Sequence, residues 1–364
     1  ATLTSVVAVC AVALVVFLSN STAASETRVD APPSAVVVAV QPNVAADFRR
    51  TREEAAALVE RHLTLSTDAL RAWDAARPEF NPNGATPASG ADIRTTGANT
   101  ATGANAPPVS VPRVVVWPES PMNFTYAGNA AFRETVAGFA RANRAAVIFN
   151  AMEPAPAEGV YNSAVLVDAE GRMAAQYDKI RLLPFGEYVP LPRWLPASWL
   201  LSGIVGNFTP GDKYPLMPLG AAGDGAARAG VFICFESAFP EIARAFSRQD
   251  ADVLLNISND GYLGRTPVMR QHLANVVLRA VENQKPVLRV TNTGITAHIN
   301  ARGEVLDATE GFVPAVRTWT VERAGTGRTF YTRYGDVFVW LCAALSVLAL
   351  LATFKSKGSG ESNA

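Results

Sequence analysis

Residues 230–237 read GVFICFES, an apolar run that stops at a cysteine and a glutamate. Short apolar runs bounded by polar residues are typical of buried strands, so 229–234 is a predicted strand with Cys234 at its exit. Helical spacing follows over 239–247, and a second apolar run covers 253–258. Strands that alternate with helices predict an α/β domain, in which functional sites form at the carboxyl ends of strands. Cys234 is therefore a candidate site residue.

The same alternation extends in both directions from this stretch. Predicted strands lie at 34–40, 114–117, 146–150 and 287–291, predicted hairpins at 163–177 and 296–308, and predicted helices at 47–75, 130–143 and 268–283. Residues 77–112 interrupt it with Pro, Gly, Ala, Asn and Thr and almost no large apolar residues. Such a segment cannot bury enough apolar surface to offset its ordering entropy, so it is predicted to be a disordered surface insertion.

Uncharged apolar runs lie near both ends of the chain. Because roughly 17–25 apolar residues cross a bilayer, segments 1–20 and 335–354 are predicted transmembrane helices. Aromatic residues at the start of the second run and lysines after it place the tail, 355–364, in the cytoplasm and the middle of the chain outside it. A signal peptide is the alternative reading of the first run.

Composition narrows the function classes. The 364 residues carry 32 basic and 32 acidic side chains, and this zero net charge argues against a nucleic-acid partner. Three cysteines, two of them in the apolar end runs, are too few for a disulfide framework. No metal-ligand spacing and no phosphate-binding loop is present, so neither a metal nor a cofactor is expected. His272 is expected to be a helix-surface or packing residue.

Two further charged residues follow predicted strands. Glu119 comes after VVVWP (114–118), and Lys179 opens KIRLLPFGEYVPL (179–191) after a hairpin. A thiol with a pKa of about 8.5 is mostly protonated at neutral pH and needs a base. None of the three histidines lies in a recognisable Cys-His setting. A carboxylate is therefore the expected base for Cys234.

These motifs resemble a known family. WPES (117–120), the run that begins at Lys179 and ICFES (233–237) are similar to the Glu-Lys-Cys signature of the carbon-nitrogen hydrolase superfamily. The pieces that resemble its apolipoprotein N-acyltransferase branch more narrowly are VQPNV (40–44), YNSAVLVDAEGR (161–172), ISNDGYLG (257–264) and RAVENQKPVLRVTNTGITA (279–297). The resemblance implies a nitrilase-like αββα sandwich over 34–325, flanked by N- and C-terminal transmembrane helices. That branch has several membrane helices before the catalytic domain, so a truncated copy is expected here.

The resemblance also implies roles for individual residues. Cys234 would be the nucleophile, Glu119 the general base, and Lys179 would hold the oxyanion together with the backbone N–H of Phe235. Glu187 would orient Lys179 or the incoming amine. Glu236 would act similarly or form a structural salt bridge. The supporting or substrate-facing positions implied by the same motifs are Trp117, Phe185 and Tyr262.

The implied reaction is an acyl transfer at a bacterial inner membrane, with the catalytic domain on the periplasmic side. Cys234 would take an acyl chain from a phospholipid as a thioester and pass it to the α-amine of a diacylglyceryl-modified apolipoprotein. Two alternatives remain open on the sequence: an amidase-like hydrolase of the same superfamily, with water as acceptor, and an inactive membrane-bound remnant. The intact Glu119, Lys179 and Cys234 argue against the remnant.

Overall fold

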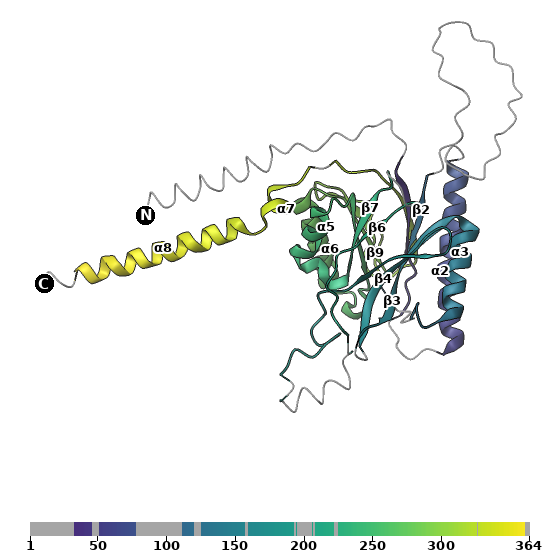
Figure 1. Ribbon diagram of the computed structural model, residues 1–364, viewed down its shortest axis with the longest axis horizontal. Helices are drawn as coiled ribbons and strands as arrows, with labels where there is room; N and C mark the ends of the chain where they lie inside the picture. Colours follow the sequence, from purple (N-terminus) through teal and green to yellow (C-terminus); the bar gives the residue numbers. More distant parts are fainter. Residues whose placement is uncertain are drawn as a thin grey trace, which may run out of the picture.

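Two six-stranded sheets pack face to face between two layers of helices (Figure 1). The computed structural model describes residues 33–45, 51–77, 111–119, 125–156, 159–192, 208–221, 225–325 and 327–360, together with residues 194 and 206. The predicted segment 1–20 and most of the predicted insertion 77–112 lie outside the described residues.

The first sheet has the strand order β12-β1-β2-β3-β4-β5. Its strands are β1 (Ala35–Gln41), β2 (Arg113–Val116), β3 (Ala145–Pro154), β4 (Val160–Val167), β5 (Met173–Asp178) and β12 (Ala315–Val321). Strands β1, β2 and β3 are parallel, and the remaining pairs are antiparallel.

The second sheet repeats this plan in the order β11-β10-β9-β8-β7-β6. Its strands are β6 (Leu216–Pro218), β7 (Arg228–Ile233), β8 (Val253–Ser258), β9 (Val287–Thr291), β10 (Ala297–Ile299) and β11 (Val305–Leu306). Here β7, β8 and β9 are parallel and the outer pairs antiparallel. Each sheet therefore aligns the carboxyl ends of its three parallel strands.

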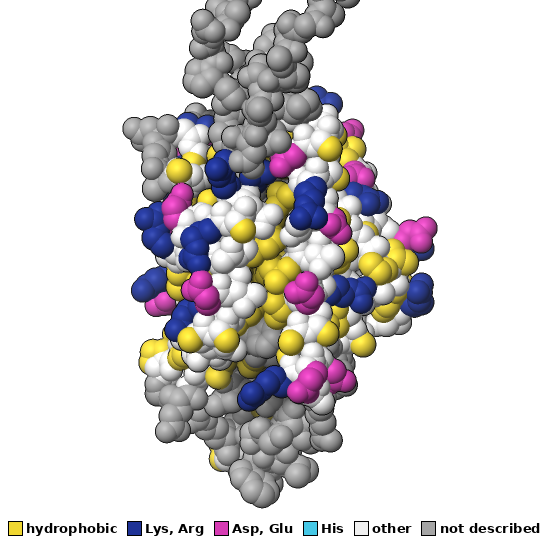
Figure 2. Space-filling model, turned by 90° about the vertical axis from the view of Figure 1, so that its right-hand side faces the viewer, with side chains coloured by type: hydrophobic (Ala, Val, Ile, Leu, Met, Phe, Trp, Pro, Cys, Tyr) yellow, Lys and Arg dark blue, Asp and Glu magenta, His cyan; other side chains and the backbone are white. Residues whose placement is uncertain are grey.

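Helices cover the outer face of each sheet. Helices α2 (Arg52–Ala76) and α3 (Ala130–Asn143) pack on the first sheet, and α5 (Pro240–Arg248) and α6 (Val268–Asn283) on the second. Helix α2 begins at a capping box, in which Thr51 and Glu54 satisfy each other's backbone N–H groups. Figure 2 shows the outer surface of the α2 and α3 layer, where acidic and basic side chains are interspersed around a strip of hydrophobic ones.

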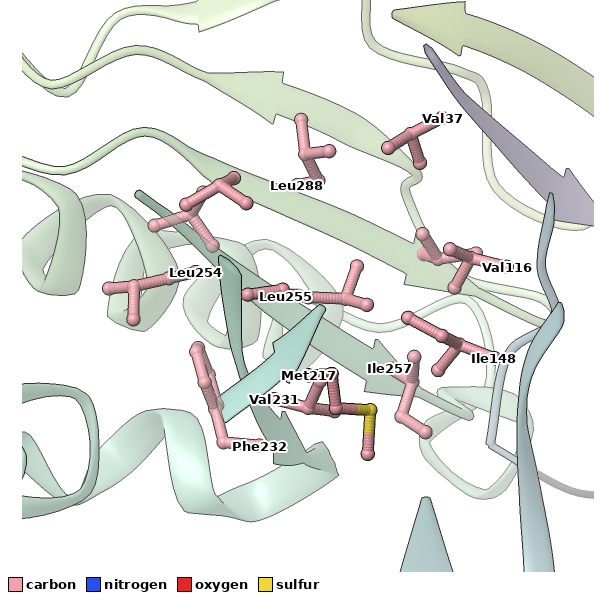
Figure 3. Close-up of a cluster of buried hydrophobic side chains, with 14 of the residues drawn as sticks. Val37, Val116, Ile148, Met217, Val231, Phe232, Leu254, Leu255, Ile257 and Leu288 are labelled. Atoms are coloured by element: carbon pink, nitrogen blue, oxygen red, sulfur yellow. The ribbon is translucent and has the colours of Figure 1, made fainter. Parts of the chain in front are cut away.

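Alternate residues of the central strands fill two separate cores. Val37 of β1 and Val116 of β2 pack between the sheets with residues such as Leu255 of β8 (Figure 3). Val38 and Val115 point the other way, into the core beneath α2 and α3. Burial on both faces explains why these strands are continuous apolar runs rather than alternating ones.

The predicted α/β sandwich is confirmed, and α3, β8, α6 and β9 begin and end at the predicted residues. Strands β6 and β12 were not predicted. The short β6 contains a proline, and β12 alternates polar with apolar residues at an outer position of the sheet.

The predicted flanking transmembrane helices are not confirmed. The chain ends in α7 (Phe330–Tyr334) and α8 (Val337–Gly360), and residues 361–364 lie outside the described residues. Among the residues that the structure describes, no helix combines the length and the apolarity that a membrane crossing requires.

Candidate active site

Three strands deliver the predicted catalytic residues to one place. Glu119 follows β2 by three residues, Lys179 directly follows β5, and Cys234 directly follows β7. Strands β2 and β5 belong to one sheet and β7 to the other, so the site lies where the two packed sheets meet. The Nζ of Lys179 is 3.5 Å from Oε1 of Glu119, and the charges of both residues act on the Cys234 thiol.

Lys179 is held between two carboxylates. Its side chain is only 1% exposed, and its Nζ donates to Oε1 of Glu187 at 2.8 Å in addition to its contact with Glu119. Burial opposes the charged form, but attraction to the carboxylates of Glu119 and Glu187 outweighs burial and raises the pKa of Lys179. The lysine is therefore a fixed positive charge at neutral pH.

Asn162 of β4 joins the two carboxylates, and the sequence did not point to it. Its Nδ2 donates to Oε1 of Glu119 at 3.0 Å and to Oε1 of Glu187 at 2.7 Å. Its Oδ1 accepts from Nδ2 of Asn150 at 2.6 Å. The second oxygen of Glu119 accepts from the backbone N–H of Asn259 at 3.2 Å. These bonds fix the orientation of both carboxylates before any substrate is present.

Cys234 occupies a strained turn between β7 and the 3-10 helix η2 (Cys234–Ala238). Its φ of 52° lies in the left-handed region, which residues other than glycine rarely adopt unless the surrounding structure enforces it. Burial and the negative charge of Glu119 raise the pKa of the Cys234 thiol, while Lys179 acts in the opposite direction. The resting thiol is therefore protonated and depends on a base for activation.

Glu236 fastens this turn to the Lys179 segment. Its carboxylate accepts from the backbone N–H groups of Ile180 and Ile233 at 2.7 and 2.8 Å, and from the Tyr177 hydroxyl at 2.8 Å. No ion pair of Glu236 occurs within the described part of the chain. Of the two predicted roles, orientation of the lysine loop fits this geometry. Backbone N–H groups and the Tyr177 hydroxyl satisfy the carboxylate, so the predicted salt bridge does not form among the described residues.

The other predicted positions fall into two groups. Trp117 is fully buried and donates from Nε1 to Ser66 of α2 at 3.0 Å, so it supports the end of β2 from behind. Phe185 and Tyr262 are 57% and 59% exposed. Partial burial and the charges of Glu119 and Cys234 raise the pKa of the Tyr262 hydroxyl to about 12. The Phe235 ring packs edge-on against Phe239.

His272 differs from its expected surface or packing role. It is buried in α6, and its ring nitrogens lie 2.8 Å from Oδ1 of Asp260 and 3.0 Å from the carbonyl oxygen of Cys234. Helical periodicity places His272 on a face of α6 but does not show which strand end lies opposite that face. Because Cys234 and His272 lie 38 residues apart in the sequence, no local pattern shows that they are in contact.

Comparisons with known proteins show the family of this chain. The carbon-nitrogen hydrolase family profile matches residues 37–329. A relative from Geobacter metallireducens named apolipoprotein N-acyltransferase is 38% identical over 247 residues, which cover 67% of this chain and 46% of the relative. A second one, from Thermotoga maritima, is 34% identical over 55% of this chain and 38% of its own length. The chain thus spans less than half the length of these two relatives.

Solved structures share the fold at low sequence identity. Nit3 of Saccharomyces cerevisiae, described as a nitrilase-superfamily member, has a TM-score of 0.53 at 15% identity, over 79% of this chain and 90% of its own. An amidase from Nesterenkonia sp. has a TM-score of 0.52 at 17% identity, over 86% and 98%. With the family profile covering both sheets and every residue of the site, the chain belongs to the carbon-nitrogen hydrolase family.

Proposed function

We propose that this chain is an N-acyltransferase that moves an acyl chain from a phospholipid, through a thioester on Cys234, to the N-terminal amine of a diacylglyceryl-modified apolipoprotein. The observation that carries the proposal is a buried lysine fixed between Glu119 and Glu187 beside a cysteine in a strained turn. The names of the two relatives support N-acyl transfer as the reaction and an apolipoprotein as the acceptor.

The first half-reaction forms the thioester. Glu119 takes the thiol proton, and the sulfur attacks the ester carbonyl of the phospholipid. Negative charge develops on the carbonyl oxygen, where Lys179 and the Phe235 N–H stabilise it. The C–O bond then breaks, and the departing alkoxide of the lysophospholipid takes the proton from Glu119. Because the lysine is fixed before substrate arrives, stabilising this charge requires little reorganisation.

The second half-reaction returns the enzyme to its starting state. The α-amine of the acceptor attacks the thioester carbonyl, and Glu119 accepts a proton from the amine nitrogen. The C–S bond breaks, an amide forms, and the proton passes from Glu119 to the sulfur. Glu187 keeps Lys179 in place through both steps by its 2.8 Å bond. No dissociable cofactor takes part in either step.

Exposed apolar side chains around the site suit lipid substrates. Leu183, Phe185 and Tyr188 surround Glu187 in sequence and are 37%, 57% and 38% exposed. Trp194, further along this loop, is 80% exposed, and Tyr262 projects from the loop after β8. Exposed apolar groups of this size commonly mark lipid or protein contacts. We infer that acyl chains lie against these residues during transfer.

The same reasoning extends to location and domain organisation. Helix α8 exposes Val339, Trp340 and Leu348 at 58%, 73% and 62%. We propose that segments 335–354 and 1–20 hold the 34–325 domain at a bacterial inner membrane on its periplasmic side. Residues 355–364 would then be a cytoplasmic tail. Donor and acceptor would both reach the site from that membrane.

Intact-mass measurement tests the proposed reaction. The protein, with Cys10 and Cys342 replaced by alanine, is incubated in detergent with a phospholipid of one defined acyl chain. We expect a hydroxylamine-sensitive gain of one acyl chain, its loss on addition of a diacylglyceryl-cysteine peptide, and no gain in Cys234→Ala. An adduct that water releases as fast as the peptide does would indicate a hydrolase. The absence of any adduct in folded protein would refute acyl transfer.

A further inference from the structure

A buried charged cluster lies behind Cys234, and neither half-reaction uses it. His272 comes from α6, Asp260 from the loop after β8, and Arg289 from β9. Asp260 and Arg289 are fully buried, and His272 is 8% exposed. Nη2 of Arg289 donates to both Asp260 oxygens at 3.1 and 2.9 Å, and His272 bridges Asp260 to the Cys234 carbonyl.

The hydrogen-bond partners of His272 decide where its protons lie. Burial opposes ionisation of Asp260, but the charge of Arg289 and the His272 contact hold its pKa well below the usual range. An ionised carboxylate only accepts, so Nδ1 must donate to Asp260. A backbone carbonyl also only accepts, so Nε2 must donate to Cys234.

A neutral ring fits this cluster less well. Nη2 of Arg289 lies 3.3 Å from Nδ1 of His272. An unprotonated Nδ1 would need such a hydrogen-bond donor. That tautomer would place the Nδ1 lone pair against Oδ1 of Asp260 at 2.8 Å. The shorter distance to the carboxylate therefore favours a proton on Nδ1. The Asp260 carboxylate packs directly against Gly294, where a Cβ would lie only 2.1 Å from Oδ2 of Asp260.

The carbonyl that His272 contacts belongs to the same peptide unit as the Phe235 N–H. A peptide unit is planar, so fixing the direction of its C=O also fixes the direction of its N–H. A hydrogen bond to the C=O, especially from a charged donor, polarises the unit and strengthens the N–H as a donor. The strained φ of Cys234 makes such a restraint necessary.

We propose that His272, doubly protonated and held by Asp260, whose carboxylate Arg289 in turn fixes, is a positioning residue that orients and polarises the Phe235 N–H toward the oxyanion. This inference rests on the proposed acyl chemistry and adds the source of its backbone donor. It does not depend on which acyl donor the enzyme uses.

Two reactions of Cys234 separate this role from a structural one. With Cys10 and Cys342 replaced by alanine, acylation by p-nitrophenyl butyrate passes through an oxyanion, whereas alkylation by iodoacetamide displaces iodide without one. Losing an oxyanion donor lowers kcat about 10²–10³-fold, so misorienting it in His272→Leu is expected to lower the acylation kcat about 10–100-fold with little change in KM. His272→Gln, which keeps a neutral donor, should lose less. Alkylation should stay near the wild-type rate.

The outcomes are distinguishable. His298→Gln, which replaces a half-buried histidine outside the site, should leave both rates unchanged. An equal fall of both rates in the His272 variants, or no fall in acylation, would overturn the positioning role. The ring nitrogens of His272, followed by 15N NMR at pH 7 and assigned with His272→Gln, should both be protonated, and one unprotonated nitrogen would overturn the charged ring. Acylation by the ester but not by phospholipid would refute only the proposed lipid donor, and acylation by neither would refute both proposals.

Discussion

Replacing Asn162 with leucine tests whether the carboxylates are held in place by the amide that joins them. The two side chains are similar in size, but leucine removes the donors to Glu119 and Glu187, at 3.0 and 2.7 Å, and the acceptor for Asn150. Glu119 keeps the backbone N–H of Asn259 and its contact with Lys179. The base therefore remains in the site but is held less firmly, by one backbone hydrogen bond and one ion pair.

The expected cost follows from the bonds that are lost. A hydrogen bond to a charged group contributes about 1.5–3 kcal/mol and a neutral one about 0.5–1.5 kcal/mol, so the three lost bonds contribute about 3.5–7.5 kcal/mol. Burying the leucine side chain recovers about 1.5–3 kcal/mol, so the free energy of unfolding should fall by about 2–4.5 kcal/mol. A positioned base contributes about 10²–10⁴-fold to the rate, and loss of its orientation should lower the thioester formation rate about 100-fold.

Urea unfolding and the intact-mass assay measure both effects. The control is Ser247→Ala in α5, which removes a buried bond of 2.9 Å to Ala243 away from the carboxylates. This control should lose about 1 kcal/mol of stability and none of the rate. A folded Asn162→Leu protein that forms the thioester at the wild-type rate would refute the idea that Asn162 orients the base.

Three further predictions follow from burial and charge. In Glu119→Gln, loss of a negative charge that raises the pKa of Cys234 should make the thiolate absorbance at 240 nm appear at lower pH than in the wild type, and an unchanged titration would contradict the assigned cause. Burial lowers the pKa of His62 to about 4 from 6.5, so the unfolded state binds the proton first as pH falls. The wild type should therefore lose about 3 kcal/mol between pH 6.5 and 4 that His62→Phe does not lose, as measured by urea unfolding at each pH. Gly230→Ala would place a Cβ 2.4 Å from a side chain of α5 and should lower the melting temperature, whereas Gly138→Ala has open space in helix α3 and should raise it; the reverse order would contradict these contacts.

Much of the fold was predictable because helices and strands that are buried on one or both faces leave a recognisable pattern of apolar residues in the sequence. The helix Val268–Asn283 and the strands Val253–Ser258 and Val287–Thr291 have the predicted bounds, since apolar periodicity and turn residues are local properties. Strand β12 was not predicted because most of its residues are only partly buried, and its pairing partner β1 lies at the other end of the chain. Its position depends on a long-range contact that no local pattern records.

The predicted catalytic site required more than periodicity. Glu119, Lys179 and Cys234 were selected by their motifs and by the resemblance that these motifs carry. The strand order of the first sheet brings Glu119 and Lys179 within 3.5 Å of each other, and face-to-face packing of the second sheet brings the Cys234 thiol under the influence of both charges. Asn162 was within a recognised motif, yet nothing in the sequence shows that one amide reaches two carboxylates.

The sequence by itself determined the strands, the helices and the chemical groups at the strand ends, because these depend on neighbours within a few turns of chain. Only the tertiary structure decided which of those groups meet. Charges and hydrogen bonds act through space over a few ångströms. His272 reaches the Cys234 turn from a helix 38 residues further along the chain, and Glu236 ties that turn to Ile180, 56 residues before it. Burial and the charge of Glu119, both consequences of the tertiary structure, raise the pKa of the thiol and hence create its need for a base.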